Sequence, residues 1–591
     1  MKPSVVVKRI RQKAFLTVLF LIHISASAQI VYVDASNTGA SPDGSQQNPF
    51  KTIQAGLNLA QNLDTVKVAQ GTYNENIEFP DNKGIILWGG YQTANFGNRD
   101  SQEFVTIING NNSLPVINIE FSAGSGNNRH FEIDGFTIQG GQRGIHTEDW
   151  GNGGFGFIKI ANNIIQNNGG LTGSNDYGGG INARFAAEIS NNIIRNNSCG
   201  KGGGLFLGQH STDYLFIIEN NHIENNEIYS DHGAGAYIAG RKGLIKNNSF
   251  IGNAILEGWG WGGGLIIDGG IFDGYSNSIF IELRGNIYAG NFAPSGGAGV
   301  FIDEGANVRM FNELIYKNIC TGSFRNGALY VDGLRANGNA KTIIENCTIA
   351  ENIGAEYSYG HAIFVEGGSE VIVKNSIFWD NSSDDNDNDF YVSEDSSLSI
   401  DFSIYKSGNM GDGNFTITNS FKADPLFADA ENNNFHLKSK SGRWDPHYQA
   451  WMYDEVYSPG IDSGHPDSPF DKEPAPNGGR INLGCYGNTE YASKSYANSI
   501  GVINSSIAEF SIFPNPAIFN TTIEIITKSD GVLKLEILDS KGRVIEVLHN
   551  QNKPAGKYSF VIDSSHIYPG IYFCKLEINQ YSYVAKLMII R

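Results

Sequence analysis

The most constraining feature of this sequence is a short apolar stretch between asparagine pairs, which recurs along the chain. It reads NNIIQNN at Asn162–Asn168, NNIIRNN at Asn191–Asn197 and NNHIENN at Asn220–Asn226. Looser copies follow, and each keeps the final asparagine. Asparagine is depleted in strands and favours turns, so each copy predicts a short strand that ends in a turn. The final asparagines are Asn168, Asn197, Asn226, Asn253, Asn291, Asn318, Asn352 and Asn381.

The spacing of these asparagines gives the size of the repeating unit. Successive ones are 29, 29, 27, 38, 27, 34 and 29 residues apart. A large apolar residue stands three positions before each of them, beginning with Ile165, Ile194 and Ile223. A period of this size indicates stacked units, none of which can bury its apolar face alone.

Each unit also carries a glycine run followed by three apolar residues, as in GGGLFL (202–207), GAGVFI (297–302) and NGALYV (326–331). A repeat of about 28 residues, built only of short strands and turns, fits one coil of a parallel β-helix. It is too short for a propeller blade and lacks the periods of helical repeats. The predicted fold class is therefore all-β, a parallel β-helix of about twelve coils.

The asparagines have a structural explanation in such a fold. Stacked coils lie ~4.8 Å apart. An amide at the same turn of each coil can therefore donate a hydrogen bond to the carbonyl of the next coil, which forms a ladder. The ladder satisfies turns whose backbone leaves the sheet, and the glycines permit tight corners. This interpretation requires no function of the repeat.

The N-terminus predicts export. Residues 1–28 combine basic residues, the apolar stretch AFLTVLFLIHI and the small-residue site ASA, which is typical of a cleaved signal peptide. No transmembrane segment is expected in the mature chain. A short helix is then expected with Asn48 as its N-cap and Pro49 in its first turn, covering the first coil of the array.

The repeat resembles a known group of proteins. The pairing of an apolar-x-x-Asn turn with a glycine run, as at Phe250–Asn253 and Gly262–Leu265, is similar to the repeats of right-handed β-helix proteins of the pectin-lyase-like superfamily. It also resembles the repeats of chlamydial polymorphic outer-membrane adhesins. Asp424–Gly487 looks like the closing segment of secreted bacterial β-helix proteins. The resemblance implies a right-handed β-helix over residues 29–492, with N- and C-terminal caps.

Residues 510–591 differ, because the asparagine repeat stops and alternating strands with hairpin turns replace it. FSIFPNP (Phe510–Pro516) and the terminal YVAKLMIIR resemble the type A C-terminal sorting domain of the Bacteroidetes type IX secretion system. The resemblance implies a small β-sandwich that the export machinery recognises. It also implies a protein that is secreted or attached to the outer-membrane surface. Residues 493–509 are the expected linker.

The charge of the chain restricts its partners. The net charge of −19 argues against nucleic acid, which requires basic stripes. An acidic balance suits a solvated exported protein, or one that holds cations.

Strand alternation locates candidate functional residues. In ALYVD, Leu329 and Val331 share the inner face, so Tyr330 and Asp332 face outward. The same outward positions in other coils hold aromatic residues and acids. Aromatic faces stack on sugars, and carboxylates perform acid–base chemistry or bind Ca²⁺. The candidate sugar platform is Tyr237, Phe301, Tyr330 and Phe364. The candidate catalytic acids are Asp303, Asp332 and Glu366, and the candidate calcium ligands are these three together with Asp268.

Further candidates lie near these acids. Arg325 and His361 are candidate catalytic residues, because polysaccharide lyases need a base and charge-neutralising groups. Trp259 and Trp261 form either a sugar platform or a hydrophobic lid. Each of these residues also has a structural interpretation, in which the aromatic residues stack without a ligand and the acids point into solvent.

Two functions are therefore predicted. In the first, an extracellular β-helix binds, and as a lyase or glycosidase degrades, a polysaccharide or cell-surface glycan. In the second, the protein is a non-catalytic adhesin or spacer. The clustered aromatic and acidic residues favour the first, and the absence of a recognisable lyase or glycosidase signature favours the second.

Overall fold

The computed structural model describes most of the mature chain. The predicted signal peptide (residues 1–28), except its last residue, and residues 496–506 of the predicted linker lie outside the described residues, as does Arg325. The described ranges are 28–81, 83–121, 129–149, 156–173, 175–208, 215–270, 280–322, 326–333, 341–356, 358–382, 388–495, 507–527, 530–578 and 581–590.

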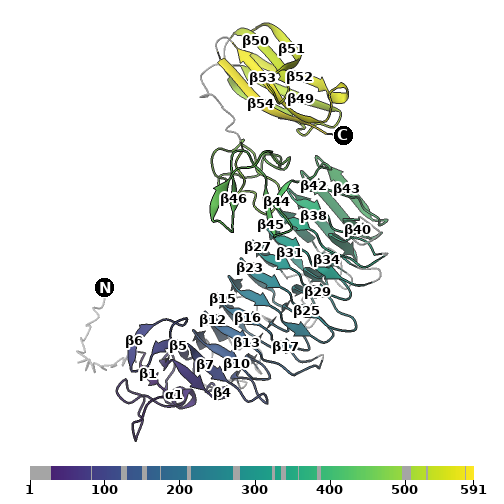
Figure 1. Ribbon diagram of the computed structural model, residues 1–591. Helices are drawn as coiled ribbons and strands as arrows, with labels where there is room; N and C mark the ends of the chain where they lie inside the picture. The colour runs from purple at the N-terminus through teal and green to yellow at the C-terminus, as the bar shows by residue number, and fades with distance from the viewer. Residues whose placement is uncertain are drawn as a thin grey trace, which may run out of the picture.

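The chain forms a right-handed parallel β-helix followed by a β-sandwich (Figure 1), as the repeat and the tail predict. The glycine signature of each coil forms a strand of one parallel sheet, here called the glycine-signature sheet, which has eleven strands in the described residues. These are β4 (Ile77–Glu78), β8 (Ile117–Phe121), β11 (Ile145–Asp149), β14 (Ile181–Ala183), β18 (Leu205–Leu207), β22 (Ala236–Ile238), β26 (Leu265–Asp268), β30 (Val300–Asp303), β34 (Leu329–Asp332), β37 (Ile363–Glu366) and β40 (Phe390–Val392).

The apolar residues between the asparagine pairs form a second parallel sheet, of twelve strands in the described residues. These are β3 (Gly71–Tyr73), β7 (Thr106–Asn109), β10 (Thr137–Gln139), β13 (Ile164–Gln166), β16 (Ile193–Arg195), β20 (His222–Glu224), β24 (Ser249–Ile251), β28 (Ile287–Ala289), β32 (Leu314–Tyr316), β36 (Thr348–Ala350), β39 (Ile377–Trp379) and β42 (Ile404–Tyr405).

The third and longest sheet contains the strands that precede each asparagine pair, which the two repeat signatures did not predict. Its residues alternate between buried and half-exposed, as in β12 (Gly156–Ala161). The antiparallel β6 (Asn95–Arg99) joins it at β5. The parallel members are β1 (Ile30–Val33), β2 (Thr65–Ala69), β5 (Ile86–Gln92), β9 (Arg129–Asp134), β12, β15 (Ala186–Ser190), β19 (Phe216–Glu219), β23 (Lys242–Lys246), β27 (Phe280–Arg284), β31 (Asn307–Phe311), β35 (Lys341–Glu345), β38 (Glu370–Lys374), β41 (Ser397–Asp401) and β43 (Asn414–Thr418).

A short fourth sheet lies after the final asparagine of each central coil, in the loop region. Its five strands in the described residues pair in parallel like the others. They are β17 (Ser198–Cys199), β21 (Glu227–Ile228), β25 (Ala254–Ile255), β29 (Phe292–Ala293) and β33 (Ile319–Cys320). Loops that leave the coil at this point therefore also stack on one another.

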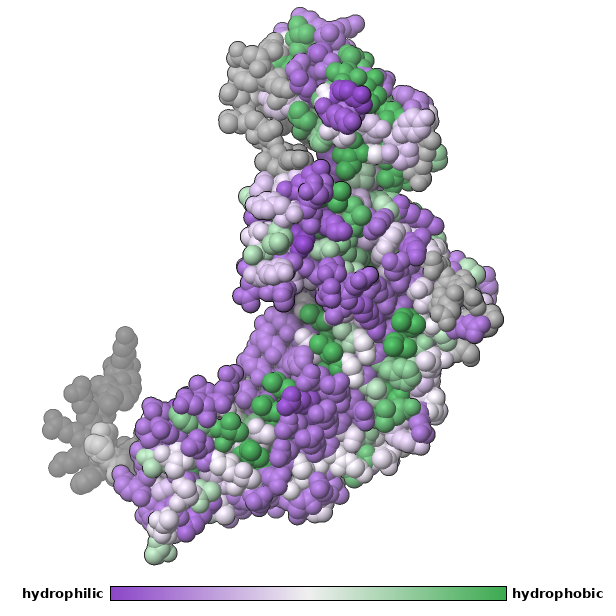
Figure 2. All heavy atoms as spheres, in the orientation of Figure 1, coloured by the Kyte–Doolittle hydropathy of each residue, from purple (hydrophilic) through white to green (hydrophobic). Residues whose placement is uncertain are grey.

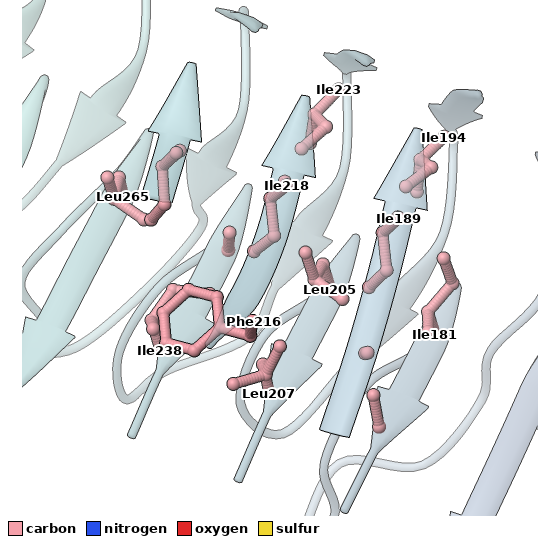
Figure 3. Packing of buried hydrophobic residues seen from close by; sticks show 14 of the residues in the cluster. Ile181, Ile189, Ile194, Leu205, Leu207, Phe216, Ile218, Ile223, Ile238 and Leu265 are labelled. Carbon is pink, nitrogen blue, oxygen red and sulfur yellow. The ribbon is translucent and has the colours of Figure 1, made fainter. Parts of the chain in front are cut away.

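Aliphatic and aromatic side chains stack in columns along the interior (Figure 3). Ile165, Ile194 and Ile223 are each fully buried and pair in register through β13, β16 and β20. Phe250 and Tyr288 continue this column with stacked rings 5.0 Å apart. The hydrophobic effect therefore acts between coils, because each coil covers the apolar face of the one before it. The face of the molecule seen in Figure 2 is mostly hydrophilic, with scattered apolar areas.

The predicted asparagine ladder is present. Asn226 donates its backbone N–H and its Nδ2 to Asn253 Oδ1, each over 3.0 Å. Its own Oδ1 accepts the equivalent two bonds from Asn197, and its Nδ2 also donates to the Ile194 carbonyl. The same pattern joins every pair of neighbours in the series from Asn168 to Asn381.

The two asparagines of each pair have different roles. Asn225 precedes Asn226, is exposed and has φ of 51°, a left-handed conformation that asparagine tolerates better than most residues. In three later coils this position is Gly252, Gly290 and Lys317, with φ of 62°, 60° and 53°. The first asparagine therefore turns the chain, and the second hydrogen-bonds to the next coil.

A parallel ladder begins at Asn163, at the other corner of the same strand, and changes its chemistry part-way. Asn286 donates to Glu313, which is fully buried. Burial raises the pKa of Glu313 to about 8, so this carboxyl is protonated at neutral pH. The next position is Cys347, whose N–H donates to Ser376 Oγ. All five cysteines are buried free thiols, as expected for small core residues.

Both ends of the described β-helix are covered. Helix α1 (Ile53–Leu59) packs Ile53 and Leu57 on the first strands. The prediction that Asn48 caps this helix is wrong, because the N-cap is Thr52 and the Glu75 carboxylate accepts the N–H groups of Ile53 and Gln54. Glu75 lies more than twenty residues away, so the helix sequence did not reveal this contact.

The C-terminal cap consists of two small hairpins and a returning segment. The hairpins are β44 (Phe427–Asp429) with β45 (Asn434–Leu437), and β46 (Arg443–Asp445) with β47 (Ala450–Met452). The returning segment packs Leu483 and Cys485 on the outside of the twelve-stranded sheet, and Asn312 donates to the Cys485 carbonyl.

The tail forms the predicted β-sandwich of two antiparallel sheets. Arg480 of the cap donates to the Asn515 carbonyl, and Met588 is buried among apolar side chains of the cap. The sandwich therefore contacts the β-helix. Its strands are β48 (Ile507–Phe513), β49 (Asn520–Thr527) and β52 (Gly556–Asp563) in one sheet, and β51 (Val544–Lys553), β50 (Gly531–Leu538), β53 (Gly570–Ile578) and β54 (Tyr581–Ile589) in the other, with the 3-10 turn η1 (Ser564–His566) between β52 and β53.

We predict that Asn226→Ala lowers the free energy of unfolding by ~1–3 kcal/mol, because it leaves buried groups on Asn197 and Ile194 without partners. Thermal or urea unfolding of the variant measures this. Asn225→Gly is the matched control, since glycine accepts the left-handed backbone of Asn225 and no ladder bond is removed. Equal effects of the two substitutions would contradict the division of roles.

Candidate functional site

The outer face of the glycine-signature sheet carries a row of apolar side chains, here called the aromatic row. Phe301 pairs with Tyr330 and Tyr330 with Phe364 in adjacent strands, so the rings follow one another along the axis. Neighbouring ring centroids are 4.8 and 5.1 Å apart. The row consists of Phe206, Tyr237, Ile266, Phe301, Tyr330 and Phe364, and it forms a cluster separate from the interior core.

Two residues further along each strand lies a row of acids, here called the carboxylate row. It consists of Asp268, Asp303, Asp332 and Glu366 from four successive coils. Asp268 pairs with Asp303, and Asp332 pairs with Glu366. Strand spacing places neighbouring backbones ~4.8 Å apart. The structure thus assembles the outward acidic stripe that the sequence predicts.

Tyrosines of the aromatic row hold the two ends of the carboxylate row. The Tyr237 hydroxyl donates to Asp268 Oδ2, and the Tyr330 hydroxyl donates to Glu366 Oε1. Asp268 and Glu366 are only 5% and 7% exposed. The two central acids, Asp303 and Asp332, are half-buried and more accessible. The reachable part of the row is therefore the central pair.

Asp303 has a strongly altered acidity. Burial, followed by the charges of Asp268, Asp332 and Glu304, raises its pKa to about 8. Its Oδ1 accepts the N–H of Glu304, which is too little to reverse the shift. At neutral pH Asp303 therefore carries a proton. A protonated carboxyl in a row of acids is typical of acid–base catalysis.

The predicted sugar platform needs a correction. Tyr237, Phe301, Tyr330 and Phe364 face outward as the alternation predicts, but they are only 4%, 3%, 1% and 0% exposed. The rings pack on one another, and the half-buried Tyr177, Trp261 and Tyr391 pack against the row. In this structure these four residues stabilise the outer face of the sheet and do not present ring faces to a ligand.

The two tryptophans approach the row from the start of the strands. Trp261 stacks on Phe301 with centroids 6.1 Å apart, and Trp259 contacts Trp261 edge-on at 5.5 Å. Trp259 is 56% exposed. Trp261 therefore covers the aromatic row, as a lid would, whereas Trp259 presents an aromatic surface that a ligand can reach.

Of the two remaining candidates, only His361 is described, and it does not join the central acids. Arg325 lies outside the described residues. His361 is buried, 1% exposed, and lies five residues before Glu366, at the opposite end of strand β37. At ~3.3 Å per residue this separates their backbones by about 16 Å. His361 instead lies against the loop at Gly354, where an added Cβ would be 2.1 Å from its Nδ1.

The carboxylate row continues towards the N-terminus with a basic residue. Arg184 forms an ion pair with Glu148 at 3.8 Å, and its guanidinium lies 4.5 Å from the rings of Tyr177 and Phe206. Gly208 and Ala239 separate Arg184 from Asp268 in the same outward position of successive coils. In the sequence, Arg184 stands at the same outward position of its repeat as the acids do. The burial of its side chain is not evident from the sequence.

Calcium remains a prediction. Within the described ranges, no group of three or more His, Cys, Asp and Glu side chains has the arrangement of a metal site. The four acids nevertheless supply hard oxygen ligands of the kind that Ca²⁺ prefers.

Comparisons with known proteins agree with the tail and are sparse elsewhere. Residues 511–590 match the family described as "Secretion system C-terminal sorting domain", and residues 296–464 match the family "Disaggregatase related". No curated protein matches the chain. Among solved structures, the crystal structure of pectate lyase Pel9A aligns at a TM-score of 0.36 and 10% identity, over 78% of this chain and 96% of that one.

The chain ends in a secretion sorting domain. The protein is therefore exported through the type IX system, and is released or retained at the cell surface. In the described part of the chain, no helix combines the length and the apolarity needed to cross a bilayer.

We predict that Asp303→Asn changes the pH dependence of stability. Between about pH 4 and pH 8 folded Asp303 keeps a proton that the unfolded chain releases, so the free energy of unfolding of the wild type falls as pH rises. The variant should therefore gain at least ~1 kcal/mol relative to wild type between pH 4 and pH 8.5. Denaturant unfolding at both pH values measures this.

The exposed Asp412 provides the control, because Asp412→Asn removes a carboxyl without a neighbouring acidic row. The free energies of unfolding of Asp303→Asn and wild type could instead differ by the same amount at both pH values. That result would show that Asp303 is ionised in the folded protein.

Proposed function

We propose that this protein is an exported glycoside hydrolase that binds and cleaves an extracellular polysaccharide at the carboxylate row. The observation that carries the proposal is the pair Asp303 and Asp332, one coil apart, in which Asp303 is protonated at neutral pH. Glycosidases need a carboxylic acid beside a carboxylate, and their carboxyl groups are ~5 Å apart in retaining enzymes. Neighbouring coils of a β-helix supply this spacing.

The chemistry follows from the two protonation states. Asp303 donates its proton to the glycosidic oxygen, so the leaving sugar departs as an alcohol. The Asp332 carboxylate attacks the anomeric carbon and forms a glycosyl ester. Asp303, now ionised, takes a proton from water, whose oxygen displaces Asp332 and releases the second sugar. Both carboxyl groups return to their starting states.

A hydrolase fits this site better than a lyase does. Polysaccharide lyases remove a proton beside a uronate carboxylate and need cations to neutralise it. The described site presents four acids in a row, which would repel a uronate. The bond cleaved is therefore assigned to an uncharged part of the polymer.

Two further findings support a polysaccharide substrate. The sorting domain places the protein outside the cell, where polysaccharides are the abundant polymers. The match to the family "Disaggregatase related" covers residues 296–464, which include Asp303, Asp332 and Glu366. A family named for disaggregation is consistent with action on material that holds cells or particles together.

A non-catalytic adhesin is the second candidate. The burial of the aromatic row and the two tyrosine–carboxylate hydrogen bonds favour it, because both give the outer face of the sheet a structural role. In that case the acids stabilise the stack, and binding occurs elsewhere on the surface.

The deciding experiment incubates the mature protein with a polysaccharide panel and measures reducing ends and unsaturated uronates. We expect reducing ends without unsaturated products, and a loss of at least ~100-fold for Asp303→Asn and for Asp332→Asn. Asp412→Asn should retain wild-type activity. Unsaturated products would show a lyase, and folded protein without activity on any polysaccharide would support the adhesin.

Calcium binding is tested separately. Ionising Asp303 above pH 8 adds a negative charge to the carboxylate row, and a cation that binds only the folded state raises stability. We therefore expect Ca²⁺ to raise the melting temperature more at pH 9 than at pH 6, and Asp332→Asn to abolish most of the rise. If Ca²⁺ raises the melting temperature of Asp332→Asn as much as that of the wild type, the ion binds elsewhere. No response at either pH would contradict a calcium site.

A further inference from the structure

The cap hairpin β46–β47 has two chemically opposite faces. Its register pairs Trp444 directly with Trp451, while Arg443 pairs with Met452 and Asp445 with Ala450. Because side chains alternate along a strand, the two tryptophans share one face and Arg443 and Asp445 share the other. Folding ordinarily buries the aromatic face of such a hairpin and exposes the charged one.

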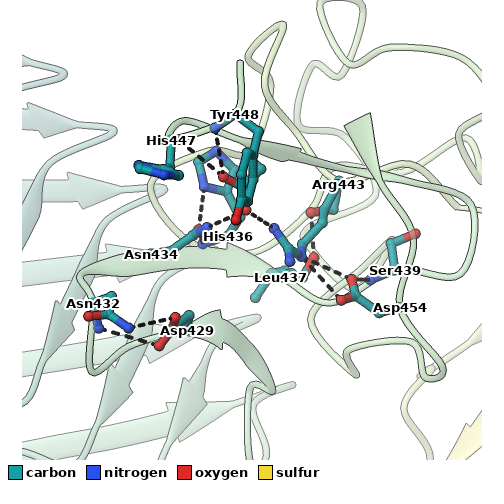
Figure 4. Close-up of polar contacts among 12 residues, drawn as sticks. Asp429, Asn432, Asn434, His436, Leu437, Ser439, Arg443, His447, Tyr448 and Asp454 are labelled. Carbon is teal, nitrogen blue, oxygen red and sulfur yellow. Dashed lines mark hydrogen bonds and ion pairs between the residues drawn. The ribbon is translucent and has the colours of Figure 1, made fainter. Parts of the chain in front are cut away.

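In this hairpin the charged face is the inner one. Arg443 donates to Asp445 Oδ2 over 2.8 Å and to Asp454 Oδ2 over 3.1 Å, and Asn434 donates to Asp445 (Figure 4). The three charged side chains are only 12%, 10% and 13% exposed. Backbone N–H groups of His447 and Tyr448 also donate to Asp445, so the hairpin is fixed to the cap by charge-assisted bonds.

The aromatic face lies outside the apolar core. Trp444 lies 5.8 Å from Trp451 and 5.5 Å from Tyr491, and neither tryptophan belongs to an apolar core cluster of the described residues. Both tryptophans are half-buried, whereas Tyr453 and Tyr491 are 73% and 42% exposed. These four rings, here called the cap platform, form a partly exposed aromatic cluster whose position core packing does not explain.

A cation lies over one ring of the cap platform. Lys494 Nζ is 3.8 Å from the ring centroid of Trp451, and no carboxylate of the described residues lies within ion-pair distance of it. Trp451, Tyr453 and Lys494 converge on Gly442, each 3.7 Å from the position of an added Cβ. Because Gly442 has no side chain, these three groups lie together on one surface.

We propose that the cap platform is a binding site for a uronic-acid-containing polysaccharide, separate from the carboxylate row. Aromatic faces stack on sugar rings, and the Lys494 ammonium supplies the positive charge that a uronate carboxylate requires. Among the partners that such a surface fits, the uncompensated cation on a protein of net charge −19 selects an anionic one.

The choice of a glycan as ligand rests on the proposed function. The family match over residues 296–464 spans the carboxylate row and the hairpin together, which supports one polymer serving both. The two sites then recognise different parts of a mixed polymer. The cap platform binds acidic sugars, and the carboxylate row, which repels them, acts on uncharged sugars.

Affinity electrophoresis and calorimetry of the mature full chain, with polygalacturonate and a neutral dextran as probes, test the proposal. We expect binding to polygalacturonate, and at least a tenfold weaker affinity for Tyr453→Ala and for Trp451→Ala. Tyr453 is 73% exposed, so its substitution does not threaten folding. Lys494→Met should reduce the affinity for polygalacturonate and its salt dependence.

Matched controls are Tyr568→Ala, an aromatic residue 81% exposed on the sorting domain, and Lys472→Met, an exposed lysine of the cap. Both should bind as wild type does. The proposal is overturned if wild type fails to bind polygalacturonate, if Tyr453→Ala and Trp451→Ala bind unchanged, or if dextran binds equally well. Loss of hydrolysis in Asp303→Asn with binding retained separates this site from the proposed catalytic one.

Discussion

The hydrogen bond between asparagine side chains of successive coils is the interaction on which the rest of the structure depends. A β-helix must turn its backbone out of the sheet several times per coil, and each turn would leave buried amides unpaired. Asn226 and its neighbours satisfy these amides through side chains, so every coil has the same corner. A constant corner keeps strands in register, and register places Asp303 beside Asp268.

The same register creates the chemistry of the outer face. In a globular enzyme the catalytic acids come from segments that are distant in the sequence. In this β-helix, acids at the same position of successive coils form a row because the coils stack in register. The rise per coil fixes the spacing, and burial together with the crowding of like charges raises the pKa of Asp303. The tyrosines at both ends of the row hold the outer carboxyls, and the central pair is the more accessible part of the row.

The sequence predicted the ladder, two of the repeating sheets and, through its resemblance, the sandwich tail, but not the third sheet or the tertiary contacts that occur once. The ladder, the glycine-signature sheet and the carboxylate row follow from period and alternation, and all are present. The burial of Phe301 and Tyr330 was not predictable, because alternation gives the direction of a side chain and not what covers it. The Glu75 cap of helix α1 and the position of His361 depend on tertiary contacts, which local patterns do not encode.

The hairpin β46–β47 occurs once in the chain. Its orientation costs free energy that apolar packing does not offset. Burying Arg443 with two aspartates removes three charges from water. Such a buried ion-pair network rarely stabilises a protein more than apolar side chains of similar size would. Trp444 and Trp451 could have supplied such apolar packing had the hairpin faced the other way. Because the rows of a β-helix run parallel to its axis, a linear polymer can follow them from coil to coil. An aromatic cluster at the end of that path is therefore consistent with the proposed ligand site.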